Sequence, residues 1–260
     1  MSRILVSGWL CGALISSMAA QTPEPTIGVE LFYAAYRDWD ADRLASAEQL
    51  LEQTLEGTPG SWLGWYWLGV VRFHRFLMTA CRDTETYSIA SCRDLWNRAV
   101  RTLDETVRLR PPDAESHAML ATLYGIRCRE SRWRAWWYGP LVVKHQEVAL
   151  ANGVDNPRVQ YLWGAACLAT ARSDSDWQLA SERLRRAEAL FEVEAREATD
   201  PQKPRWGRPS ALTLLGEACE RQGHWQEAAR WYSKALHLQP GNQRARAALA
   251  RLQMRNVEIP

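Results

Sequence analysis

The side chains that most often carry chemistry are present, but their spacing matches no recognised catalytic or metal-binding motif. No histidine is spaced from another His, Cys or carboxylate as metal ligands are in known motifs. The sequence has no glycine-rich phosphate loop and no nucleophile elbow. We therefore expect a non-catalytic protein that needs no cofactor and no metal. The five histidines are His74, His117, His145, His224 and His237.

One stretch interleaves arginine with aromatic residues, from Arg127 to Tyr138. Such a pattern can stack on nucleobases or sugars, or lie at a lipid interface. The competing interpretation places the tryptophans between neighbouring helices and leaves the arginines in solvent. We favour this second, structural interpretation.

The charge balance gives little reason to expect a nucleic acid partner. The chain has 32 basic and 30 acidic residues, and both signs are spread along its length. A nucleic-acid-binding protein usually carries a basic patch or tail instead. This balance favours a protein or peptide partner.

The first twenty residues have the composition of a secretory leader. Arg3 precedes an apolar run from Ile4 to Ile15, and small residues end the segment at Ala20. The run is shorter than the roughly 20 residues that span a bilayer. We expect a signal peptide over 1–20 with cleavage near Ala20, a short linker over 21–26, and a soluble mature chain that is secreted or periplasmic. An uncleaved membrane anchor is the alternative.

The periodicity of small and apolar residues is clearest between Pro209 and Pro240. It predicts two short helices that face each other, with Gly223 and His224 at the turn. Small residues such as Gly216 allow the two helix backbones to approach closely. This segment resembles a tetratricopeptide repeat. The facing residues are Leu212, Leu215, Gly216, Cys219, Ala228, Tyr232, Ala235 and Leu236.

The same register recurs upstream. Trp65, Leu68 and Gly69 match the W-x-x-L-G pattern of that family, in a unit with about eighteen extra residues. The resemblance implies an all-α fold, a short right-handed α-solenoid of about five helix pairs over 27–256. Residues 136–164 and 204–240 resemble exported bacterial members of the family. The expected units lie near 28–61, 62–113, 114–156, 157–208 and 209–242, with a capping helix over 243–256 whose first turn Asn242 can cap.

The resemblance also implies a partner-binding site, because such arrays bind proteins or peptides in the concave groove lined by the first helix of each pair. This groove would run from apolar to charged and would suit a helix or an extended segment with an apolar anchor. The alternative is that flanking insertions cover the apolar strip and make it core. The groove positions are Leu63, Tyr66, Val70, Phe73 and His74 in the second unit, Arg158 and Tyr161 in the fourth, and Glu217 and Arg221 in the fifth.

Export would place five cysteines of the mature chain in an oxidising compartment. Cys81 and Cys92 flank the insertion of the second unit and are the favoured disulfide, closing a short loop. Cys128 is the competing partner for either one. Cys167 and Cys219 occupy equivalent positions of adjacent repeats, about 10 Å apart, which is too far for a bridge. We expect these two to be buried thiols.

These observations favour a non-catalytic scaffold that binds a protein or peptide in the bacterial cell envelope. One alternative is a small-molecule or glycan-binding protein, in which tryptophans near 133–137 line a pocket closed by the insertion. Another is an accessory subunit of an envelope enzyme or transporter. The sequence identifies neither the partner nor the oligomeric state.

Overall fold

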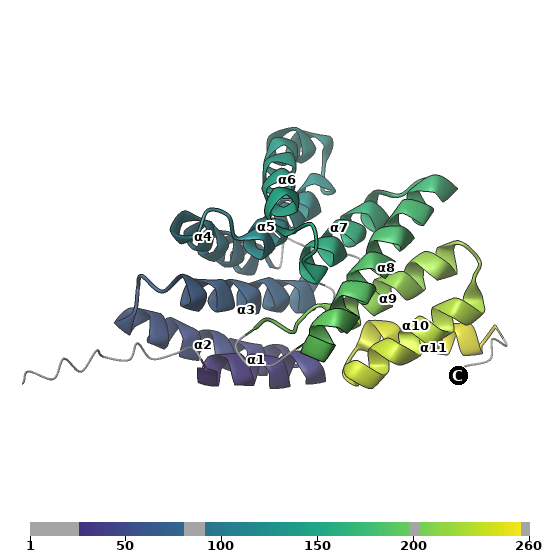
Figure 1. The fold of residues 1–260 in the computed structure, drawn as a ribbon, viewed down its shortest axis with the longest axis horizontal. Helices are drawn as coiled ribbons and strands as arrows, with labels where there is room; N and C mark the ends of the chain where they lie inside the picture. The colour runs from purple at the N-terminus through teal and green to yellow at the C-terminus, as the bar shows by residue number, and fades with distance from the viewer. Residues whose placement is uncertain (1–25, 81–91, 198–202, 256–260) are drawn as a thin grey trace, which may run out of the picture.

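The computed structural model of the chain describes residues 26–80, 92–197 and 203–255 (Figure 1). Within these ranges the protein consists of eleven α-helices and no β-strand. None of these helices is both long enough and apolar enough to cross a membrane. The predicted leader and Cys81 lie outside the described residues. The helices are α1 Thr26–Asp38, α2 Ala41–Gly57, α3 Trp62–Ala80, α4 Arg93–Leu109, α5 Ala114–Cys128, α6 Arg132–Gly153, α7 Pro157–Thr170, α8 Asp174–Glu197, α9 Arg208–Arg221, α10 Trp225–Leu238 and α11 Gln243–Gln253.

The helices pack as consecutive pairs, α1 with α2 through α9 with α10, and α11 covers the end of the array. This arrangement confirms the predicted α-solenoid of five helix pairs and a final helix. Small residues at the crossings explain how closely the helices approach. A Cβ added at Gly69 on α3 would lie 2.6 Å from Leu103 of α4, and one at Gly216 on α9 would lie 2.6 Å from Tyr232 of α10. A side chain at either position would therefore force the facing Leu103 or Tyr232 to shift.

The last helix begins as its sequence predicted. The Asn242 side chain accepts a hydrogen bond from the backbone N–H of Ala245 at 3.0 Å, which caps one of the free N–H groups of the first turn. Ala245 and Leu252 are buried against α9 and α10, in a small apolar cluster at this end of the array. The larger cluster extends from α1 to α9. The array therefore has a covered end.

The two ends of the solenoid touch each other, which the sequence did not predict. The backbone N–H of Gly241 donates to the carbonyl of Arg37 at 3.3 Å, and the side-chain amide of Gln239 donates to the carbonyl of Tyr36. A Cβ at Gly241 would lie 2.2 Å from the carbonyl oxygen of Asp38. The array therefore curls until α1 meets the turn between α10 and α11 (Figure 1).

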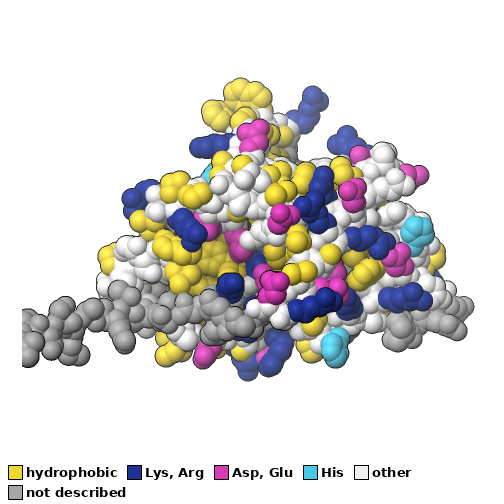
Figure 2. Space-filling view, in the orientation of Figure 1, with side chains coloured by type: hydrophobic (Ala, Val, Ile, Leu, Met, Phe, Trp, Pro, Cys, Tyr) yellow, Lys and Arg dark blue, Asp and Glu magenta, His cyan; other side chains and the backbone are white. Residues whose placement is uncertain are grey.

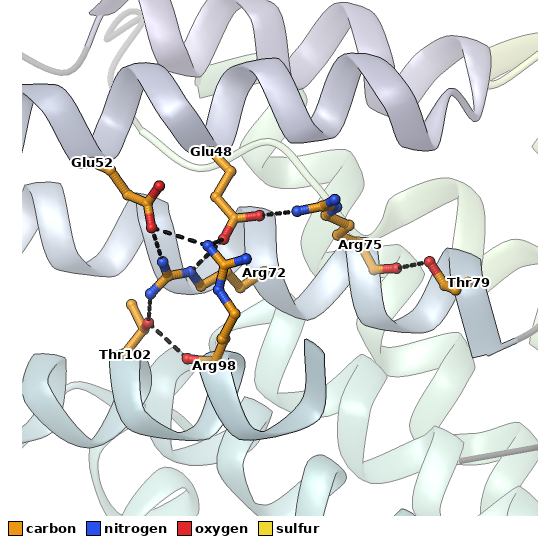
Figure 3. Close-up of polar contacts among 7 residues, drawn as sticks. All are labelled: Glu48, Glu52, Arg72, Arg75, Thr79, Arg98 and Thr102. Atoms are coloured by element: carbon orange, nitrogen blue, oxygen red, sulfur yellow. Dashed lines mark hydrogen bonds and ion pairs between the residues drawn. The ribbon is translucent and has the colours of Figure 1, made fainter. Parts of the chain in front are cut away.

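A buried glutamate joins three consecutive helices of the first two units (Figure 3). Glu48 on α2 is 2% exposed and forms ion pairs with Arg72 at 2.7 Å and Arg75 at 2.5 Å, both on α3, and with Arg98 on α4 at 2.6 Å. Burial alone would raise the pKa of Glu48, but the hydrogen bonds from Arg72 and Arg75 outweigh it and the pKa is lowered. The cluster fixes α2, α3 and α4 relative to one another.

Replacing Glu48 by glutamine should lower the free energy of unfolding by about 3 kcal/mol, because Arg75 loses its carboxylate partner and the partly buried Arg72 and Arg98 keep only Glu52. Urea denaturation measures this change. Glu105→Gln is the matched control, since Glu105 pairs with the exposed Arg108 one turn away on the same helix, and it should leave the midpoint unchanged. Equal midpoints for the two variants would contradict a structural role for the cluster.

Two neutral histidines are buried between α5 and α6. The Nδ1 atoms of His117 and His145 lie 2.8 Å apart, and His117 Nε2 lies 2.9 Å from the carbonyl oxygen of Pro111. Since that carbonyl must accept, His117 carries its proton on Nε2 and accepts at Nδ1 from His145. Burial lowers the pKa of both rings, that of His145 to about 4. Charging either ring is therefore unfavourable in this buried position, and a proton on His117 Nδ1 would also remove the acceptor of the hydrogen bond.

This pair should make the protein acid-sensitive. The folded-state pKa values lie below the unfolded value of about 6.5, so the unfolded chain takes up protons first as the pH falls. Stability contributed by the pair is complete above about pH 6.5 and is lost progressively toward pH 4. His145→Phe should lower stability at pH 8 but flatten its decrease between pH 6.5 and 5 in urea denaturation. The same substitution at exposed His237 should leave the slope unchanged, and identical slopes for all three proteins would refute the prediction.

Candidate partner-binding groove

The predicted groove positions on α3 lie together, but they are core and not an open surface. Tyr66, Val70, Phe73 and His74 are buried, whereas Leu63 is half-buried. Tyr36 of α1 contacts the His74 ring with centroids 4.9 Å apart. The expectation of an open apolar strip is therefore wrong for this structure. The strip is core, as the alternative had it, but the cover comes from α1 and from the chain before α9 and not from insertions beside the strip.

The covering segment is the chain that enters α9. Its Trp206 is fully buried and contacts the ring of His74 at 5.0 Å and that of Phe73 at 6.3 Å between centroids. The indole N–H of Trp206 donates to the hydroxyl of Tyr66 at 3.0 Å. The pocket for this indole is thus formed by the same α3 residues that were predicted to bind a partner.

Two tyrosines of α1 hold the backbone of this segment. The N–H of Arg205 donates to the Tyr33 hydroxyl at 2.9 Å, and the N–H of Gly207 donates to the Tyr36 hydroxyl at 3.2 Å. Gly207 has a φ of +102°, a conformation that favours glycine. An aromatic anchor between two backbone contacts is how a groove can grip an extended peptide. Here the gripped peptide is residues 203–207 of the same chain, which we call the internal segment.

A buried polar network lies beneath the anchor. The Tyr66 hydroxyl donates to the carboxylate of Glu115 on α5, and Asn156 donates to the same carboxylate at 2.8 Å. Arg158 on α7 is 1% exposed, lies 3.6 Å from Glu115, and makes a bidentate pair with Glu194 of α8 at 2.8 Å. The network therefore ties the Trp206 pocket to the third and fourth helix pairs.

The charges of this network are balanced by direct contact. Burial raises the pKa of Tyr66, and the Glu115 carboxylate raises it further, so the hydroxyl stays protonated and donates. Burial would lower the pKa of Arg158, but Glu115 and Glu194 outweigh it and the pKa is raised. The guanidinium carbon of Arg158 lies 5.7 Å from the Trp206 ring centroid. A cationic side chain thus borders the aromatic pocket.

The predicted groove positions divide into two groups. Tyr161 of α7 is buried, and a Cβ added at Gly207 would lie 3.4 Å from its ring, so Tyr161 borders the internal segment together with Arg158. Glu217 on α9 instead pairs with Arg244 of α11 at 2.6 Å, and the exposed Arg221 stacks over Trp177 at 5.6 Å. The fifth-unit positions therefore do not join the pocket.

One part of the groove stays open beside the internal segment. A cavity of about 280 Å³ is bordered by Leu63, Tyr66 and Glu115, with Pro204 of the internal segment along its edge. Of the predicted α3 positions, Leu63 and Tyr66 thus border accessible space. The cavity extends the groove past the point where the internal segment occupies it.

The tryptophans near 133–137 do not form the pocket that the alternative function requires. Trp133, Trp136 and Trp137 are 67%, 65% and 58% exposed on the outer side of α6. The interpretation that they pack between helices is also wrong, because they contact each other in solvent. Among the residues that the structure describes, no three His, Cys, Asp or Glu side chains gather to hold a metal ion.

The described cysteines bear on only some of the thiol predictions. Cys167 and Cys219 are unbridged. Cys219 is buried, as expected, and burial raises its pKa to about 11, whereas Cys167 is only partly buried. The disulfide between Cys81 and Cys92 stays a prediction, since Cys81 lies outside the described residues.

Sequence reasoning missed the residues that complete the site. Trp206 and Tyr33 match no groove position of a repeat. Tyr36 in the first unit and Glu115 in the third do occupy groove positions, equivalent to Val70 and Leu63 of the second unit, but they were not among the predicted residues. The available signal was the stretch from Pro204 to Pro209, whose two prolines and one glycine favour an extended chain around a single tryptophan. The residues next to Trp206 in the sequence do not indicate which part of the fold its side chain contacts.

Comparisons with known proteins agree with this architecture. The sequence pattern of the tetratricopeptide repeat matches residues 209–242, whereas no curated protein matches the chain in sequence. A thermophilic tetratricopeptide repeat protein from Thermus thermophilus is similar in structure, with a TM-score of 0.60 and 18% identity over 89% of this chain and 100% of that one. This likeness supports the fold.

Two further solved structures are less similar. The type IV pilus biogenesis factor PilW has a TM-score of 0.44 and 16% identity over 88% of this chain and 92% of its own. YrrB, a tetratricopeptide repeat protein with an unusual peptide-binding site, has a TM-score of 0.34 and 13% identity over 87% and 98%. Neither score supports an argument about this chain. The family pattern thus identifies a tetratricopeptide repeat at residues 209–242, and the consecutive helix pairs and the likeness to the Thermus protein show that the chain has the fold of a tetratricopeptide repeat array.

Proposed function

We propose that the protein is a non-catalytic scaffold that binds a protein or peptide partner through the groove lined by α3 and α7. The observation that carries the proposal is the internal segment, because it occupies the face on which such arrays bind peptides. An extended chain with one aromatic anchor therefore fits this face without any rearrangement of the helices. The partner would present a similar segment.

The contacts of the internal segment suggest what that partner segment contains. An indole fills the pocket and gives its N–H to Tyr66, and a glycine follows it at positive φ. Arg205 precedes it, with its guanidinium 5.2 Å from the ring centroid of Tyr33. The favoured partner segment is thus basic, then aromatic, then small. It would displace the internal segment or extend from the open cavity beside Pro204.

A free peptide with the sequence of residues 203–208 should bind the Trp206→Ala variant at least about tenfold more tightly than it binds the wild type. In the wild type the tethered segment competes at an effective concentration on the order of millimolar. Fluorescence polarisation of the labelled peptide measures the affinity. The peptide should also raise the Tm of the variant, which has lost a buried indole, and leave that of the wild type unchanged.

Two controls make this test specific. The same peptide with alanine in place of its tryptophan should not bind the variant. Trp225→Ala removes a half-buried tryptophan on α10, outside the groove, and this variant should bind the peptide as weakly as the wild type. A folded Trp206→Ala protein that does not bind the peptide would contradict the proposed binding mode.

We further propose that the scaffold acts in the bacterial cell envelope, after removal of residues 1–20. The support is the apolar leader with small residues before Ala20. Intact-mass measurement of the protein purified from its own cells should give a chain that begins at Gln21. A full-length mass in the cytoplasmic fraction would contradict export and would leave the binding proposal unaffected.

A further inference from the structure

The outer face of α6 carries an exposed aromatic stripe that the groove does not use. Trp133, Trp136 and Trp137 are each more than half exposed, and their ring centroids lie 5.0 to 6.1 Å apart. Pro140 and the 55% exposed Val143 continue the stripe at helical spacing. Exposed apolar groups scattered singly need no explanation, but a contiguous group of this kind marks an interaction surface.

The stripe lies on a protruding part of the molecule. In Figure 2 a hydrophobic group stands out at the tip where Figure 1 places α6, and Lys and Arg side chains flank it on both sides. The face opposite the stripe packs on α5, where His145 and Ala149 are buried. The surface is convex. It is therefore suited to insert into a lipid layer or a concave partner surface, and not to enclose a ligand.

The charge around the stripe is strongly positive. Residues 127–144 contain five basic residues and one acidic residue. The single acid, Glu130, is already paired with Arg127 at 2.9 Å and with Arg134. Arg129 and Arg132 are exposed and have no ion-pair partner in the part of the chain that the structure describes. These two arginines are available to an external anion.

We propose that this stripe docks the protein on an anionic lipid surface. Tryptophan rings favour the boundary between lipid headgroups and acyl chains, where an apolar ring with one N–H is best accommodated. Arginines beside them pair with lipid phosphates, and the attraction to a negative surface adds to the apolar term. The first turns of α6 would lie in the headgroup layer, with the groove left free to hold its partner.

The same features disfavour other occupants. A second copy of the chain would bring the unpaired Arg129 and Arg132 of both molecules together, and the like charges would repel. A sugar would need flat ring faces with carboxylates or amides beside them. Here the faces of Trp133 and Trp136 are stacked on each other, at 24° between planes, and arginines surround them.

Cosedimentation with vesicles tests the proposal. The wild type should bind vesicles of phosphatidylglycerol and phosphatidylcholine in equal parts and not vesicles of phosphatidylcholine alone. Trp133→Ser/Trp136→Ser/Trp137→Ser should weaken binding at least about tenfold. Arg129→Gln/Arg132→Gln should weaken it about 25-fold at low salt, since each basic residue at an anionic surface contributes about a factor of five.

The matched control removes exposed apolar residues elsewhere. Ile27 and Met254 are 72% and 80% exposed, and Ile27→Ser/Met254→Ser should bind vesicles as the wild type does. Absent binding, equal binding to neutral vesicles, or binding that survives the tryptophan substitutions would each overturn the proposal. Sedimentation velocity without lipid tests the remaining alternative. A dimer that dissociates on the tryptophan substitutions would show that the stripe is an interface between copies, and this result would also overturn the proposal.

Discussion

The burial of one indole N–H constrains the centre of this molecule. Trp206 enters the core between α3 and α7, and a buried donor is costly unless it is paired. The Tyr66 hydroxyl accepts this N–H and donates its own O–H to Glu115, so each polar group along the chain of contacts is satisfied. This pairing requires α3, α5 and the segment before α9 to meet at one point. The helix pairs therefore stack along a curved path that brings these three parts together.

Buried charge makes the curl rigid. Arg158 is almost completely removed from solvent and depends on Glu115 and Glu194, which come from two other helices. In the first units Glu48 depends in the same way on three arginines. Breaking such a pair leaves a charge without solvent or partner. The helix pairs are therefore held by charged contacts as well as by the apolar seams that stack them, and binding at the groove would act on a largely preformed surface.

Local sequence patterns predicted the elements, and distant contacts determined the site. Helical spacing, the packing of Gly216 and the cap at Asn242 each depend on residues close in sequence, so they could be read directly. Trp206 binds Tyr66 across 140 positions, and no short pattern reports such a contact. The exposed tryptophans on α6 were misread for a related reason, because helical spacing alone does not distinguish a stripe that packs from one that faces solvent.

The central claim is that the groove is occupied by the internal segment in solution. Hydrogen–deuterium exchange of the full chain tests this directly, since the N–H groups of Arg205 and Gly207 donate to tyrosine hydroxyls of α1. We predict slow exchange at both amides in the wild type and faster exchange in Trp206→Ala. Exchange at the rate of an unstructured chain in the wild type would show that the segment does not occupy the groove, and the account of partner binding would fail with it.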